Sequence, residues 1–119
     1  MAWRFTSDKP VYLQISERII NKVLSGEYKP GEQIPTVRQL ALEAAVNPNT
    51  VQRAFSELEN EGIISVKGTV GRFVTEDFNV IEKSRKKTAE KIVDDFLTNM
   101  KALSISKEQA IDMIKEVRE

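Results

Sequence analysis

The sequence predicts a mostly helical α+β fold, in which three helices and a short β-hairpin precede a C-terminal hairpin of two further helices. Apolar residues recur at the three- and four-residue spacing of helices in five segments. Only the stretch 63–75 has strand-forming residues on both sides of a glycine-containing turn. With 119 residues, the chain is long enough for one small domain with an appendage. We expect the domain at residues 1–75 and the appendage at residues 76–119.

The first helix is expected from about residue 11 to residue 25. Pro10 precedes it, at a position where proline is tolerated. Ile15, Ile19 and Val23 lie on one face of this helix, and Gly26 ends it because glycine adopts a positive φ without strain. In the stretch 27–35, Pro30-Gly31 is expected to form a turn, and Pro35 keeps Ile34 extended.

Two short helices follow, separated by three or four residues. Thr36 is the expected N-cap of the second helix, and Asn47 with Pro48 marks the start of the third, which runs to about residue 61 before Gly62. The apolar residues of the second helix are Val37, Leu40, Ala41 and Ala44. Because neither helix is long enough to be stable alone, they must pack on each other and on the first helix.

The hairpin is expected from residues 63–66 and 72–75, joined by residues 67–71. Helical spacing returns at about residue 78, and a capping box at Ser106 and Gln109 starts the last helix. Two helices joined by a short turn and followed by such a hairpin are typical of a winged helix-turn-helix domain.

The third helix has a polar face that suggests a function. Its apolar face is formed by Val51, Ala54, Phe55 and Leu58, and the opposite side presents Asn49, Thr50, Gln52, Arg53, Ser56 and Asn60. Asn, Gln and Arg form paired hydrogen bonds with base edges, so this face predicts the reading of double-stranded DNA. We expect Glu57, Glu59 and Glu61 to form a solvated face that would repel phosphate, so the N-terminal half should enter the groove.

Composition excludes most other functions. The chain has no cysteine and no histidine, which removes Ser-His-Asp triads, Cys-His dyads and the common zinc sites. We therefore expect neither an enzyme nor a metal or cofactor site. Lys and Arg number 18, as do Asp and Glu, so any attraction to DNA must be local. No apolar run suits a membrane span or a signal peptide, and we expect a soluble cytoplasmic protein without a membrane partner.

Several motifs resemble the DNA-binding domain of GntR-family regulators over about residues 8–75. The resemblance rests on residues 10–15, 26–41, 46–55 and 58–64, which include Pro30-Gly31-Glu32-Gln33-Ile34-Pro35-Thr36 and Asn47-Pro48-Asn49-Thr50-Val51. The short helical tail resembles that of the YtrA-type branch. That branch implies a bacterial repressor, commonly of operons for ABC-type transporters, with no catalysis.

The resemblance, together with the polar face, indicates the DNA-binding residues. It implies that Arg38 contacts DNA, that Thr36 meets phosphate and that a wing glycine approaches the minor groove. The expected set is Thr36, Arg38, Asn47, Asn49, Thr50, Gln52, Arg53, Lys67, Thr69, Gly71 and Arg72. The wing departs from the usual Gly-x-Gly-Thr-Phe-Val, since its first glycine is displaced and Arg72 replaces threonine. The alternative for Arg72 is a strand residue that faces solvent.

The C-terminal apolar stripe is wider than a two-helix hairpin can bury, which predicts a homodimer. The expected interface residues are Ile92, Val93, Phe96, Leu97, Met100, Leu103 and Ile114. A dimer would bind a pseudo-palindromic operator. The alternatives are a monomer whose tail packs on its own domain, and a winged helix used only for protein contacts. The sequence does not indicate any small-molecule effector.

Overall fold

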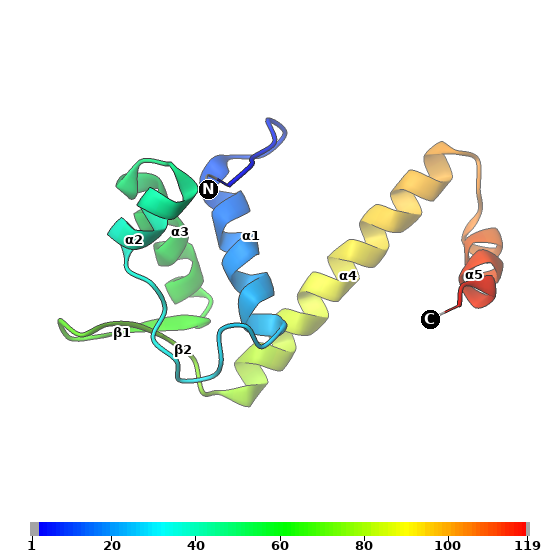
Figure 1. The fold of residues 1–119 in the computed structure, drawn as a ribbon. Helices are drawn as coiled ribbons and strands as arrows, with labels where there is room; N and C mark the ends of the chain where they lie inside the picture. The colour runs from blue at the N-terminus through cyan, green and yellow to red at the C-terminus, as the bar shows by residue number, and fades with distance from the viewer. Residues whose placement is uncertain (1–2, 119) are drawn as a thin grey trace. The chain divides into compact units, whose positions relative to one another are not determined.

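The computed structural model describes residues 3–118, and its helices and strands follow the expected order (Figure 1). The elements are α1 (Val11–Leu24), α2 (Val37–Ala44), α3 (Pro48–Asn60), β1 (Ile64–Lys67), β2 (Gly71–Val74), α4 (Phe78–Ala102) and α5 (Lys107–Glu116). The fold expected from the sequence, a winged helix-turn-helix followed by two helices, is confirmed. The chain divides into two compact units, residues 1–83 and 84–119, and α4 extends through both.

The core of the first unit lies where α3 packs against α1 and α2. All three helices contribute fully buried side chains to it: Ile15 and Ile19 from α1, Leu40 from α2, and Phe55 and Leu58 from α3. These are the apolar positions with helical spacing, so the hydrophobic pattern determines which side of α3 remains exposed. Hydrophobic burial thus positions the polar face of this helix.

The turn between α2 and α3 depends on one residue with unusual backbone geometry. Ala45 caps α2 in the left-handed conformation, with φ 59° and ψ 49°. Its N–H and that of Val46 both bond to the carbonyl of Ala41. A residue with a Cβ is strained in this conformation, which glycine adopts freely. The sharp change of direction between the two helices therefore carries a local cost.

The wing is more extensive than a two-stranded hairpin. β1 and β2 are antiparallel, with Val66 opposite Arg72. The other edge of β2 is covered by residues 31–34, because Ile34 N–H donates to the Arg72 carbonyl at 2.9 Å and Val74 N–H donates to the Glu32 carbonyl at 2.9 Å. The sequence predicted a turn here and an extended Ile34, but no pairing with a strand. The backbone of this stretch instead pairs with β2, since an open strand edge would leave these groups unsatisfied.

Both ends of the first unit pack on this core. Trp3 and Phe5 lie against it, and the Arg18 guanidinium is 4.4 Å from the centre of the Trp3 ring. At the other end, Ile81 in the first turn of α4 is buried and Val80 packs against the core. The start of α4 is thus part of the first unit.

The second unit contains the rest of α4, a turn and α5. Ser106 starts α5 with the expected capping box, in which its hydroxyl accepts from Gln109 N–H. Ala110 is the one buried residue of α5 among those described. Most of the apolar side chains of this unit are exposed. Across residues 3–118, none of the helices has both the length and the hydropathy of a membrane span.

Candidate nucleic-acid interface

Side-chain caps fix the starts of the two helices of the helix-turn-helix. The Thr36 hydroxyl accepts from Gln39 N–H at 3.1 Å, and the Gln39 side-chain oxygen accepts in return from Thr36 N–H at 2.8 Å. At α3, Asn47 Oδ1 accepts from Asn49 N–H at 2.8 Å. The Asn47 amide nitrogen can still donate. Both predicted caps are confirmed, and each places a polar side chain at a helix N-terminus, where anions are favoured.

The exposed face of α3 is the one predicted to read bases. Asn49, Gln52, Arg53 and Ser56 are exposed, and Thr50 is half-buried. The Ser56 hydroxyl donates to the Gln52 carbonyl at 3.0 Å, so it is occupied within the helix. The side chains left to reach a DNA groove from the N-terminal half are therefore amides, a hydroxyl and one guanidinium.

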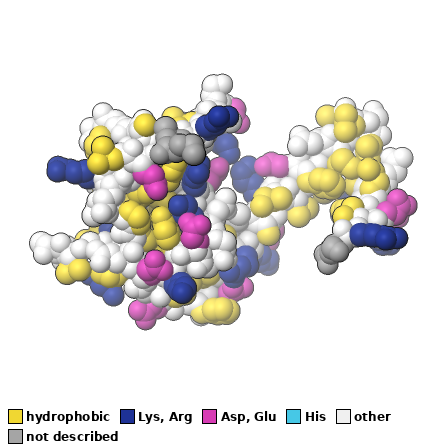
Figure 2. Space-filling model, in the orientation of Figure 1, with side chains coloured by type: hydrophobic (Ala, Val, Ile, Leu, Met, Phe, Trp, Pro, Cys, Tyr) yellow, Lys and Arg dark blue, Asp and Glu magenta, His cyan; other side chains and the backbone are white. Residues whose placement is uncertain are grey.

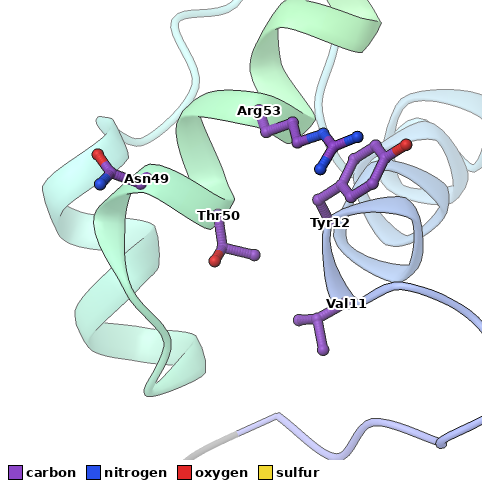
Figure 3. A pocket seen from close by; sticks show the side chains of 5 residues that line it. All are labelled: Val11, Tyr12, Asn49, Thr50 and Arg53. Atoms are coloured by element: carbon purple, nitrogen blue, oxygen red, sulfur yellow. The ribbon is translucent and has the colours of Figure 1, made fainter.

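Arg53 is held by an aromatic ring of α1. Its guanidinium lies 3.9 Å from the centre of the Tyr12 ring, close enough for a cation–π interaction. A pocket of about 360 Å³ lies beside this contact. Figure 3 shows Arg53 and Thr50 on one side of it, with Val11 and Tyr12 on the other. The ring fixes the guanidinium without neutralising its charge, which remains available to a phosphate or a base.

The other predicted cations lie on α2 and on the wing. Arg38 is exposed on α2, and Lys67 is exposed at the end of β1 with its Nζ 4.8 Å from the centre of the Phe73 ring. Thr69 is exposed in the tight turn at the wing tip. Within residues 3–118, neither Arg38, Arg53 nor Lys67 forms an ion pair with a carboxylate. Three cations of this unit are thus free to meet phosphate.

Arg72 is not a solvent-facing strand residue, and Glu59 does not belong to a solvated face. Arg72 Nε donates to Glu59 Oε1 at 2.7 Å, and the two side chains are only 22% and 29% exposed. The Arg72 guanidinium carbon is also 5.0 Å from the centre of the buried Phe55 ring. Because side chains alternate along a strand, Arg72 shares the face of buried Val74 and points towards α3.

Gly71 has a structural role in the wing. Its φ of 141° is rarely adopted by other residues, and a Cβ at this position would lie 2.6 Å from Gln33 Nε2. Gln33 Nε2 donates to the Val70 carbonyl at 2.9 Å. Glycine at this position therefore allows the Gln33 side chain to close over the wing turn. This role does not depend on whether Gly71 approaches DNA.

Three residues of this surface were not predicted from the sequence, namely Tyr12, Gln33 and Glu59. The pairing of Glu59 with Arg72 had a usable signal, since Arg72 stands two residues before the apolar Val74 and shares its face. The contacts of Tyr12 and Gln33 had none, because they join segments far apart in the chain.

The comparisons with known proteins agree with this geometry. A family model described as bacterial regulatory proteins, gntR family, matches residues 11–74. The uncharacterized HTH-type transcriptional regulator YhcF of Bacillus subtilis is 35% identical over 116 residues, which cover 98% of this chain and 96% of YhcF. The HTH-type transcriptional repressor YtrA of Bacillus subtilis is 42% identical over 71 residues, 60% of this chain and 55% of YtrA.

Solved structures show the same likeness. A GntR family transcriptional regulator from Listeria monocytogenes superposes with a TM-score of 0.85 at 37% identity, covering 96% of this chain and all of that one. The DNA-binding domain of AraR, solved in complex with operator ORE1, has a TM-score of 0.55 at 26% identity and covers 63% of this chain and 94% of its own. The likeness to this DNA complex thus covers part of the chain and not its whole length.

Proposed function

The chain belongs to the GntR family of bacterial transcriptional regulators, and we propose that it represses transcription by binding a pseudo-palindromic operator as a homodimer. Family and relatives are DNA-binding regulators and not enzymes. The observation that carries the proposal is the exposed amide and guanidinium face of α3, flanked by the unpaired cations Arg38 and Lys67. Groove-facing amides select bases, and flanking cations bind phosphate.

The DNA-binding surface is proposed to consist of the predicted set of residues, with different tasks for its parts. Asn49 and Gln52 read bases in the major groove, and Arg53 beside them meets phosphate with its unpaired charge, since all three are exposed on the N-terminal half of α3. The other residues of the set lie at the helix starts and on the wing, where the sugar-phosphate backbone would pass. They are Thr36, Arg38, Asn47, Thr50, Lys67, Thr69 and Gly71. Arg72 also belongs to this surface, but its charge is paired with Glu59.

The second copy is proposed to bind the C-terminal unit. Ile92, Val93, Leu103 and Ile114 are 64%, 53%, 69% and 55% exposed, and Phe96 is 37% exposed. Figure 2 shows hydrophobic side chains gathered over the end of α4 and α5. Leu97 and Met100 are half-buried and continue the stripe. A helix face of this kind is self-complementary about a two-fold axis, so one copy can cover its partner.

The two-fold symmetry of the proposed dimer determines the spacing of the half-sites in its operator. Two recognition helices related by a two-fold axis meet half-sites about 34–36 Å apart, or one helical turn of DNA. Sedimentation should show a dimer, and footprinting of the DNA upstream of its own gene should protect two inverted half-sites. A monomer in sedimentation, or protection of a single half-site, would contradict the dimer.

Repression is proposed because a relative, YtrA of Bacillus subtilis, is named a transcriptional repressor. The YtrA-type tail favours an operon for an ABC-type transporter as the target, and a chromosomal operator places the protein in the cytoplasm. Deleting the gene and sequencing total RNA tests this. Increased transcripts of a transporter operon are expected, whereas decreased transcripts would indicate an activator.

A further inference from the structure

Arg72 links the wing to the base-reading face of α3. Its Nε donates to Glu59 Oε1 at 2.7 Å, and its Nη2 lies 3.5 Å from Gln52 Oε1. Its guanidinium carbon lies 5.0 Å from the centre of the fully buried Phe55 ring. One side chain from β2 thus touches the core, an acidic residue of α3 and a predicted base-reading residue of α3.

The contact determines the orientation of the Gln52 amide. A guanidinium only donates hydrogen bonds, so the amide group can face Arg72 only with its oxygen. The amide nitrogen then points away from Arg72 along the exposed face of α3. Gln52 therefore offers hydrogen-bond donors to a groove, while its oxygen is engaged with the wing.

Glu59 keeps Arg72 in this position. The carboxylate neutralises the guanidinium and fixes it by a charge-assisted bond, and both side chains are more than two-thirds buried. Arg72 is therefore poorly suited to binding a phosphate. Its position in β2 couples the wing to a base-reading residue instead.

We propose that Arg72 is a specificity-determining positioning residue, which turns Gln52 to read guanine rather than adenine. This inference rests on the proposed operator binding. A free glutamine pairs with adenine by accepting from N6 and donating to N7, whereas guanine presents two acceptors, N7 and O6. With its oxygen held by Arg72, Gln52 has lost half of the adenine pair but can still donate to both guanine atoms.

The test begins with a duplex selected by the wild-type protein from a randomised library. Each base pair of that duplex is replaced in turn, and binding is measured for wild type and for Gln52→Ala. The position where Gln52→Ala loses discrimination is the one that Gln52 reads. There, the wild-type protein should favour guanine over adenine by about tenfold.

Arg72→Met keeps the aliphatic stem against Phe55 but removes every donor. It should reduce the preference for guanine to within about twofold at that position, and leave the other positions unchanged. In a Gln52→Ala background it should change nothing further at that position. Arg38→Met is the matched control, since it removes an exposed cation of another helix, α2, and should weaken binding to all duplexes equally.

Glu59→Gln provides a second variant in case Arg72→Met melts at a lower temperature. It loosens Arg72 while freeing its charge, so affinity for all duplexes should rise while the preference for guanine falls. If the Glu59–Arg72 pair only stabilised the fold, Glu59→Gln would lower both the affinity and the preference for guanine. The inference is overturned if adenine is selected at the Gln52 position, if no position depends on Gln52, or if Arg72→Met keeps the preference. If the wild-type protein selects no duplex at all, the proposed function itself fails.

Discussion

Salt should weaken operator binding steeply although the chain carries no net charge. Each protomer has three unpaired cations on the candidate surface, Arg38, Arg53 and Lys67, whereas Arg72 is neutralised by Glu59. A dimer would then neutralise about six phosphates, which gives a log–log slope near −5. Between 50 and 200 mM salt, affinity should therefore fall about 10³-fold. Fluorescence anisotropy with a labelled operator at five or six salt concentrations measures this slope.

Matched variants separate the paired cation from the free ones. Arg38→Ala removes two phosphate contacts per dimer and should make the slope shallower by about 2 units. The double variant Arg72→Ala with Glu59→Ala removes a neutral pair, so it should leave the slope unchanged. A wild-type slope near zero would refute DNA binding through these cations. A slope of about −2 to −3 would mean that one subunit binds at a time, and a shallower slope in the double variant would show that Arg72 meets phosphate after all.

Three further predictions concern single side chains. Arg53→Ala should weaken operator binding by about 1–3 kcal/mol and leave the melting temperature unchanged. Tyr12→Leu removes only the ring that contacts Arg53, so it should weaken binding less. Equal losses of affinity in anisotropy titrations would contradict this order. Phe96→Asp should dissociate the dimer in sedimentation, because a carboxylate buried in an apolar interface costs several kcal/mol, whereas the same charge at Thr98, on the opposite side of α4, should not. Ala45→Gly should raise the free energy of unfolding by about 0.5–1 kcal/mol in urea titrations, since φ is 59° there, and a loss of stability would refute the strain.

Local signals in the sequence were sufficient for most of the fold. Thr36, Asn47 and Ser106 cap helices because a short polar side chain precedes each apolar pattern, and all three caps are present. The face of α3 also followed from spacing, since burying Val51 and Phe55 leaves Gln52 exposed. These features depend on neighbours within four residues, which is the range that sequence patterns describe well.

The rest of the site depends on contacts between distant segments. The sequence shows Tyr12 as one residue of an amphipathic helix, and its stacking on Arg53 becomes apparent only once α1 and α3 pack. The spacing of Arg72 and Val74 shows which side of β2 Arg72 shares, but that it meets Glu59 becomes apparent only once β2 packs near α3. The left-handed turn at Ala45 was hidden for another reason, because alanine gives no local signal for a positive φ.

The pairing of residues 31–34 with β2 separates the wing into two parts that can change independently. A shift of one residue in β2 would exchange the sides of Arg72 and Phe73, but hydrogen bonds on both edges of the strand oppose such a shift. The tip at Gly68 and Thr69 lies beyond this doubly bonded region. Insertions or substitutions at the tip can therefore alter how the wing meets a DNA backbone without disturbing the residues at its base. Related regulators could diversify one part of the wing while keeping the other.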